Sequence, residues 1–388
     1  MKKINILATL LMGAMVLTSC ESDRDDNPIL NVPATFTQLT PAIGDRVINL
    51  ENSESVAFKA EAAPNYGFPT ETSYWIEFTE AADFSDMSKV VATDTKAKSI
   101  NYDAPANEID LGIMKLRGYE KPEQVDKSEV ISLNVRMVAC LANSTDSSTY
   151  VYSNPQTIKV TSYFLQESLP QFWYMTGENI ADGSWANDPE KIGTGMLPMY
   201  VKAGEKYNRF TGDGNIEYVG YFTEASNGFK VIAPKGLSNW NYGMCGDGHS
   251  LDDGEGFTYR NNDNDKGNIT VKKAGYYRLT ISTTDHTMKS EPYVPETPVK
   301  VYKSMKIGEN DMAPVTTIAG GINHDWFATV TLKSGSLKFT AGDGTAWGAD
   351  VFPCGIATND GGAIPAQEGT YKIYFNDITG AYMFIKQK

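Results

Sequence analysis

The chain has 388 residues, enough for two to four domains that each bury a hydrophobic core. Its 48 acidic and 34 basic residues give a formal net charge of −14, and no segment gathers lysine and arginine into a stripe able to displace counterions. The composition therefore argues against nucleic acid binding and against electrostatic docking on anionic lipid, but it leaves neutral ligands open.

The N-terminus has the pattern of a lipoprotein signal peptide. Residues 1–3 are basic at the two lysines, residues 4–17 are apolar, and Leu17-Thr18-Ser19-Cys20 forms a cleavage box. The apolar run is too short to serve as a permanent membrane span. We expect removal of residues 1–19 and acylation of Cys20, which tethers the mature chain without a transmembrane helix. An ordinary secretory signal with a chance cysteine is the alternative.

Residues 20–31 follow the box as a short acidic tether. A solvated spacer is the simple interpretation. Residues 32–165 show short alternating strands at 56–60, 72–78, 131–140 and 156–160, which predict an immunoglobulin-like sandwich. One helix is predicted over residues 108–116. Trp75 and Cys140 lie inside strands and are expected in the core, Cys140 as a free thiol.

The rest of the chain contains a repeat, assigned to residues 169–292 and 299–388. Each copy opens on a strand ending in Gly-Glu-Asn, continues to a Phe-Lys-Val or Leu-Lys-Phe strand and a tryptophan loop, and closes on a Gly-Thr/Tyr-Tyr strand. The pattern predicts an all-β fold with an N-terminal immunoglobulin-like sandwich and two tandem β-sandwich modules. Three prolines within residues 291–298 predict a stiff connector, so that three β-domains follow one another on a string.

Motifs of catalysis and metal binding are scarce. The sequence has no HExxH, GxSxG or P-loop, and its three histidines, His249, His286 and His324, lie far apart and are expected in loops. Residues 261–267 are rich in oxygen ligands, but their spacing departs from an EF-hand and favours a solvated loop. No cofactor or metal is expected, although a pair of glycosidase carboxylates stays open because acidic residues are plentiful.

Tryptophans in polar loops are the best candidates for a binding site. Trp185, Trp240 with its neighbour Tyr242, and Trp347 are surrounded by small and polar residues, which favours exposure. Aromatic rings stack on the C–H faces of sugars, and polar neighbours bind the hydroxyl groups. Trp173 and Trp326 alternate with apolar residues and are expected in the core.

Two lysines, Lys230 and Lys338, precede the tryptophan loops at similar distances. Their repeated placement suggests one basic residue at the rim of each site. Surface lysines are usually only solvated, so the repeat alone supports this role.

These features resemble the SusE/SusF family of outer-membrane starch-binding lipoproteins. The similarity rests on the lipid box with its acidic tether, on segments 74–78, 83–85, 152–154 and 160–163, on the Gly-Glu-Asn openings, and on residues 332–339. It implies non-catalytic capture of starch or another polysaccharide at the cell surface, beside a TonB-dependent transporter and a partner lipoprotein. It also implies a lipid-anchored, outer-membrane location.

The resemblance implies platform aromatics and one basic residue in each module. They correspond to Trp185, Trp240, Tyr242 and Lys230 in the middle module and to Trp347 and Lys338 in the last. The last module departs from this pattern, because residues 312–314 stand where the middle module has its Trp185 loop. Two other functions stay open: a structural or adhesive lipoprotein, and, less favoured, a glycosidase.

Overall fold

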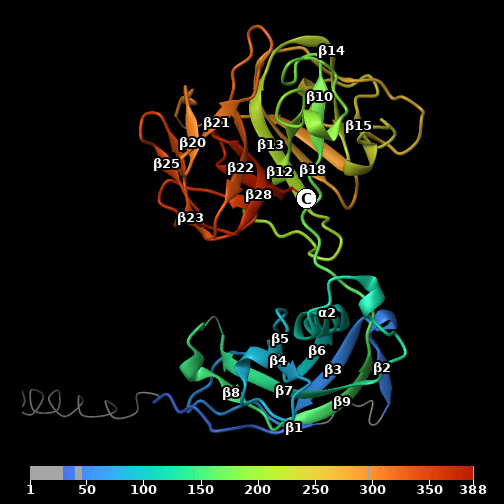
Figure 1. The fold of residues 1–388 in the computed structure, drawn as a ribbon, viewed down its shortest axis with the longest axis vertical. Helices are drawn as coiled ribbons and strands as arrows, with labels where there is room; N and C mark the ends of the chain where they lie inside the picture. The colour runs from blue at the N-terminus through green and yellow to red at the C-terminus, as the bar shows by residue number, and fades with distance from the viewer. Residues whose placement is uncertain (1–28, 40–45, 143, 296, 388) are drawn as a thin grey trace, which may run out of the picture. The chain divides into compact units, whose positions relative to one another are not determined.

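The structure, a computed structural model, describes residues 29–39, 46–142, 144–295 and 297–387. The predicted signal peptide, Cys20 and most of the acidic tether lie outside these residues. Within them, no helix is long and apolar enough to cross a membrane. The chain divides into two compact units, Met1–Gln166 and Glu167–Lys388, and strands predominate in both (Figure 1). The predicted all-β fold is confirmed.

The first unit is a sandwich of two sheets. One sheet has the order β1-β3-β6, and the other has the order β2-β9-β7-β4-β5 with β8 beside β7. The strands are β1 (Gln38–Leu39), β2 (Val47–Asn49), β3 (Ser55–Ala60), β4 (Thr72–Thr79), β5 (Val91–Ala92), β6 (Asn101–Pro105), β7 (Ile131–Leu141), β8 (Val151–Tyr152) and β9 (Gln156–Thr161). Alternate residues of β3 are buried, as expected for a strand with one face on the core.

The outer face of strand β4 is covered as well. Trp75 packs there with Val138 and Cys140 in a small separate cluster. Its burial and that of the free Cys140 thiol agree with the sequence prediction.

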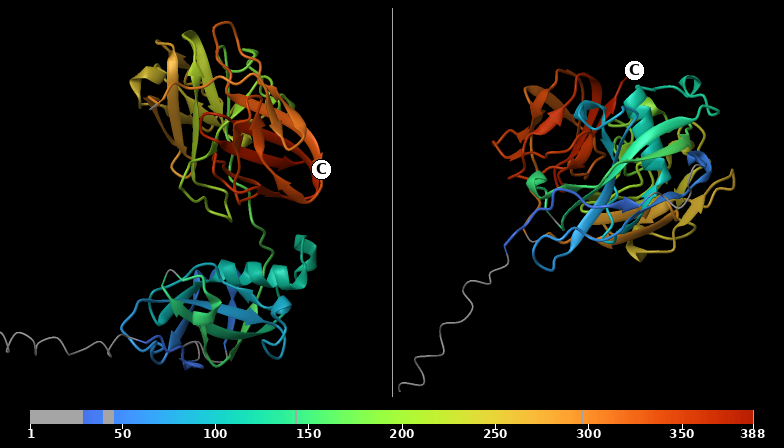
Figure 2. Two further views of the ribbon diagram at one scale, coloured as in Figure 1. Left: turned by 90° about the vertical axis from the view of Figure 1, so that its left-hand side faces the viewer. Right: turned by 90° about the horizontal axis from the view of Figure 1, so that it is seen from below.

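Helix α2 (Ala106–Arg117) lies along this sandwich (Figure 2) and contains the predicted helical segment. Gly112 allows its close approach, because a Cβ there would lie 2.3 Å from the Phe78 ring. The helix also buries Asp110, whose carboxylate accepts hydrogen bonds from the Ser162 hydroxyl at 2.8 Å and the Tyr163 N–H at 3.1 Å. Burial raises the pKa of Asp110 to about 6.

We predict that Asp110→Asn flattens the pH dependence of stability. A raised folded-state pKa means that the folded chain holds the proton more tightly, so this group's contribution is full near pH 4 and falls as the pH rises through about 6. Asparagine keeps a carbonyl acceptor without the charge. Relative to wild type, the variant should gain about 1–3 kcal/mol between pH 4 and pH 7 in urea unfolding. The exposed Asp103→Asn is the matched control, and parallel curves for Asp110→Asn and wild type would contradict the prediction.

The repeat predicted from sequence is present as matching strand pairings in the second unit. In the middle module β10 pairs with β14 and β14 with β15, and in the last module β20 pairs with β24 and β24 with β25. Likewise β13-β18-β19 corresponds to β22-β28-β29.

The strands of the middle module are β10 (Tyr174–Gly177), β11 (Leu197–Pro198), β12 (Tyr200–Val201), β13 (Asn215–Phe222), β14 (Ala225–Ile232), β15 (Gly243–Cys245), β16 (Thr258–Arg260), β17 (Ile269–Val271), β18 (Gly275–Ser282) and β19 (Thr287–Pro292). Those of the last module are β20 (Met305–Ile307), β21 (Asn310–Pro314), β22 (Asp325–Leu332), β23 (Gly335–Leu337), β24 (Phe339–Ala341), β25 (Ala346–Trp347), β26 (Cys354–Ile356), β27 (Ile364–Ala366), β28 (Gly369–Asn376) and β29 (Ala381–Lys386). Short 3-10 turns are η1 (Leu50–Asn52), η2 (Met87–Lys89), η3 (Pro122–Gln124), η4 (Ser147–Thr149), η5 (Pro189–Lys191), η6 (Pro234–Gly236) and η7 (Leu251–Asp253).

The two modules of the second unit share part of their core, because the last module has a core cluster of its own but also contributes side chains to the core of the middle module. Tyr374 and Met383 of the last module belong to the core cluster of the middle module. The Tyr374 hydroxyl donates to the Ile192 carbonyl at 3.2 Å, and the Tyr218 hydroxyl donates to the Asp325 carboxylate at 2.7 Å. This arrangement differs from the expected string of separate domains. The prolines mark an extended connector, but they carry no information about the surfaces on either side of it.

Buried polar side chains reinforce this junction. His324 lies in a loop, as predicted, but it is buried. It bonds to Asp377 at 2.7 Å and to the Tyr276 hydroxyl at 3.0 Å. Because Tyr276 belongs to the middle module and the other two residues to the last, this network ties the modules together.

We predict that residues 299–388 do not fold as a compact unit when produced alone. Separation would expose Tyr374 and Met383, which are buried against the middle module. The isolated segment should bind a hydrophobic dye and unfold without cooperativity, whereas residues 167–388 should unfold in one cooperative transition measured by calorimetry. Cooperative unfolding of the isolated segment, with no dye binding, would contradict the shared core.

Candidate functional site

Trp185 and Trp240 lie on two loops of the middle module that hydrogen bonds join. The Ser238 N–H donates to the Asn187 carbonyl at 2.8 Å, and the Asn187 side-chain amide donates to the Gly236 carbonyl at 3.0 Å. The sequence placed both tryptophans in polar loops, and the structure brings these loops together although they are about fifty residues apart.

Both tryptophans have a left-handed backbone. The φ angle is 55° at Trp185 and 64° at Trp240, a region that bulky side chains rarely adopt. Each such residue costs on the order of 1–3 kcal/mol, and strained residues cluster at functional sites. Both side chains are half-buried. The core of the middle module, as far as the chain is described, includes neither indole. The loops therefore hold two large aromatic rings outside the core.

A tight turn fixes the Trp240 loop. The Trp240 N–H donates to the Gly236 carbonyl at 2.9 Å. A Cβ at Gly236 would lie 2.2 Å from the Tyr242 carbonyl oxygen, so only glycine fits. The Tyr242 carbonyl also accepts from the Ala233 N–H at 3.1 Å. The Tyr242 side chain is half-buried and packs at the edge of the core, so it offers less free surface than a loop platform.

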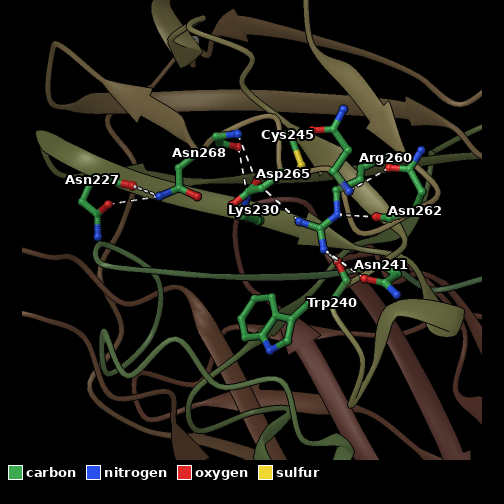
Figure 3. Close-up of polar contacts among 11 residues, drawn as sticks. Asn227, Lys230, Trp240, Asn241, Cys245, Arg260, Asn262, Asp265 and Asn268 are labelled. Atoms are coloured by element: carbon green, nitrogen blue, oxygen red, sulfur yellow. Dashed lines mark hydrogen bonds and ion pairs between the residues drawn. The ribbon is translucent and has the colours of Figure 1, made fainter.

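Arg260, at the end of β16, anchors the main chain of the Trp240 loop (Figure 3). Its guanidinium is buried, donates to the Trp240 carbonyl, and reaches the Asn241 side-chain oxygen at 3.3 Å. It also lies 3.4 Å from the Asp265 carboxylate. A rigid guanidinium with several donors can fix several acceptors at once. The Trp240 main chain is therefore anchored while its indole points away from this network (Figure 3).

Lys230 is not at the rim of the site, which corrects the prediction. It is only 8% exposed. Its ammonium group pairs with Asp265 and donates to the Gly267 carbonyl at 3.0 Å. The hydrogen bond from Lys230 lowers the pKa of Asp265. Strand β14 is covered on both faces, so that Lys230 and its neighbour Phe229 are both buried. Lys230 thus supports the site from inside and is not available to a ligand.

The loop of residues 261–267 is largely exposed to solvent, as predicted, and is tied to the protein through Asp265. Asp265 pairs with both Lys230 and Arg260. In the described parts of the chain, no group of three or more His, Cys, Asp or Glu side chains is placed to hold a metal ion.

Trp347 of the last module is a core residue, and the prediction that it is exposed is wrong. It is 7% exposed and lies within β25, where it pairs with Phe339 of β24. Its ring meets Phe375 edge-to-face, with ring centroids 5.5 Å apart. Trp240, in contrast, lies in the loop before β15. The two tryptophans occupy similar positions in the sequence repeat, but Trp347 lies within a paired strand and Trp240 lies in a loop. This difference explains why only Trp347 is buried.

The last module also lacks a counterpart of the Trp185 loop. Residues 312–314, the departure noted in the sequence, belong to β21, which forms a tight hairpin with β20. Lys338 is exposed, but its ammonium group donates to the Gly361 carbonyl at 2.8 Å. The last module therefore presents neither of the two tryptophan platforms of the middle module.

The sequence analysis missed Arg260, since it stands alone before an asparagine-rich segment and repeats nowhere else. Its one signal is position: a cation ending a short strand beside the oxygen-rich residues 261–267. Pairing of β16 with β15 places Arg260 opposite Gly243, close to the Trp240 loop.

We predict that Trp347→Ala destabilises the protein much more than Trp240→Ala does. Trp347→Ala removes a buried ring and should lower the free energy of unfolding by about 3–5 kcal/mol. Trp240→Ala removes a half-buried ring outside the core and should cost less than about 1 kcal/mol. Urea unfolding of both variants tests this difference. Equal losses would show that Trp240 is a core residue or that Trp347 is not.

Residues 23–105 match the family model described as SusE outer membrane protein. The solved structure of SusF from Bacteroides thetaiotaomicron is similar at 12% identity, covering 91% of this chain and 76% of that chain, with a TM-score of 0.23. Over these residues the family match agrees with the predicted SusE/SusF resemblance. It lies in the first unit and its N-terminal tether, so it does not include the tryptophan loops.

Proposed function

We propose that this chain, which is similar to the SusE outer membrane protein family over residues 23–105, is located at the outer membrane and captures a polysaccharide at the cell surface without catalysis. The observation that carries the proposal is the pair of indoles, Trp185 and Trp240, held outside the core on two joined loops. Indoles offer rigid contact area with little side-chain entropy to lose. A sugar ring can stack its C–H face on such a surface.

The polar rim of the proposed site comes from amide side chains. Asn187, Asn239 and Asn241 lie on the same two loops as the tryptophans. Asn239 and Asn241 also brace the Trp240 turn, because the Asn241 N–H donates to the Asn239 side-chain oxygen at 2.9 Å. Asparagine donates and accepts, so it suits sugar hydroxyls. Neutral rim groups accord with an uncharged glycan, which the net charge of −14 does not repel.

The preformed loops favour a binder over a spacer or adhesin. Strained backbone persists only where its surroundings fix it, and Arg260 and Gly236 do so at Trp240. A spacer needs no such fixed aromatic surface. We further propose that acylated Cys20 tethers the chain to the membrane. The tethered protein then delivers polysaccharide to a TonB-dependent transporter with a partner lipoprotein.

The test is affinity electrophoresis of the soluble chain, without the first 28 residues, against starch, β-glucan, mannan and xylan. Trp240→Ala should weaken retention more than Tyr242→Ala, because Tyr242 packs at the core edge. A loss of roughly 1–3 kcal/mol is expected by analogy with stacking of bases on aromatic rings. Phe84→Ala, a half-buried aromatic in the first unit, is the control.

Two outcomes would contradict the proposal. Full retention of Trp240→Ala with an unchanged melting temperature would show that Trp240 is no platform. Release of reducing ends from a retained glycan, above a heat-inactivated control, would show an enzyme.

A further inference from the structure

A pocket of about 530 Å³ lies between the two modules of the second unit. Residues 202–207, which follow β12, line one side, and residues 351–356, which lead into β26, line the other. Strand β12 packs against β26 and β29, so the shared core fixes the spacing of the two sides. The volume is in the range of small-molecule sites, which often occur at domain junctions.

The side formed by the last module is apolar and left uncovered. Val351 is 52% exposed, although it is a large hydrophobic residue. Phe352 is half-buried and is held edge-to-face against Tyr371, with centroids 5.6 Å apart. The Tyr382 hydroxyl fixes the backbone by donating to the Val351 carbonyl at 2.7 Å. This apolar surface is therefore rigid before any ligand arrives.

The opposite side supplies an aromatic ring and paired charges. Tyr207 lines the pocket and packs closely on Gly214, where an added Cβ would lie 3.0 Å from the Tyr207 Cβ. Lys202 and Glu205 form an ion pair at 2.7 Å, and Glu205 also accepts a hydrogen bond from Asn215. The ion pair leaves the exposed Lys206 as a further donor on this side, which suits a ligand with hydroxyl groups.

Cys354, on the side formed by the last module, is a half-buried free thiol that lines the pocket. Burial raises its pKa to about 11, in keeping with apolar surroundings. Tyr207 has a raised pKa from burial, with Cys354 as a nearby group.

We propose that this pocket is a second glycan site, in which Tyr207 and Phe352 contact a short neutral segment of the polysaccharide. The proposal rests on the function proposed above and adds a subsite outside the tryptophan loops. A ligand with an apolar face and hydroxyl groups matches the two sides. Both sites lie on one compact unit, so a long chain that reaches both gains affinity through effective concentration.

The test compares four proteins by calorimetry with the polysaccharide that affinity electrophoresis identifies: wild type, Trp240→Ala, Tyr207→Ala and Val351→Lys. Val351→Lys places a charge in the pocket at an exposed position, so it should fold even if Tyr207→Ala does not. Each pocket variant should weaken binding of the long chain by roughly fivefold to tenfold, an effect of lost avidity. Phe84→Ala should leave binding unchanged.

The outcomes separate the two proposals. Weaker binding of Trp240→Ala with unchanged binding of both pocket variants overturns the second site alone. Unchanged binding by Trp240→Ala, together with weaker binding by both pocket variants, overturns the tryptophan site and leaves the pocket as the binding site.

Labelling of Cys354 by a small methanethiosulfonate reports on the pocket directly, since Cys140 and Cys245 are buried. The same polysaccharide should slow labelling at least threefold, whereas dodecanoate should not. Protection by dodecanoate alone would show an acyl-chain pocket and overturn the proposal.

Discussion

The hydrogen bond from the buried Arg260 guanidinium to the Trp240 carbonyl is the interaction on which the proposed site depends. It fixes the main chain of a residue whose left-handed backbone would otherwise relax. Asp265 pairs with Arg260 and also with Lys230. The Trp240 main chain is thus held by a network of charged side chains. The charged side chains of this site therefore hold the loop in place, and the groups proposed to contact the ligand are the neutral indoles and asparagine amides.

The strand predicted over residues 56–60 and the helix predicted over residues 108–116 lie within the observed β3 and α2. Trp185 and Trp240 were also predicted outside the core, since small and polar neighbours mark a loop. The pairing between strands was not predictable from the sequence, and it determines where the other residues of the site lie. It buries Trp347 opposite Phe339 and brings Arg260 to the main chain of the Trp240 loop.

The shared core of the two modules gives the second unit a property that linked domains would lack. Contacts such as Tyr374 to Ile192 hold the modules at one spacing, so surfaces on different modules have a fixed geometry. The pocket between residues 202–207 and 351–356 exists only because of this junction. The last module has no counterpart of the Trp185 loop, and it contributes to the middle module through packing at the junction.

The central claim is that the indoles of Trp185 and Trp240 form the glycan platform. Intrinsic fluorescence tests it directly, in variants carrying Phe at one or both positions, titrated with an oligosaccharide of the retained glycan. The account predicts a ligand-induced emission change in wild type, a reduced change in each single variant and none in the double variant. An unchanged emission response in Trp185→Phe/Trp240→Phe would contradict it, because the remaining tryptophans, which are buried, would then report the binding.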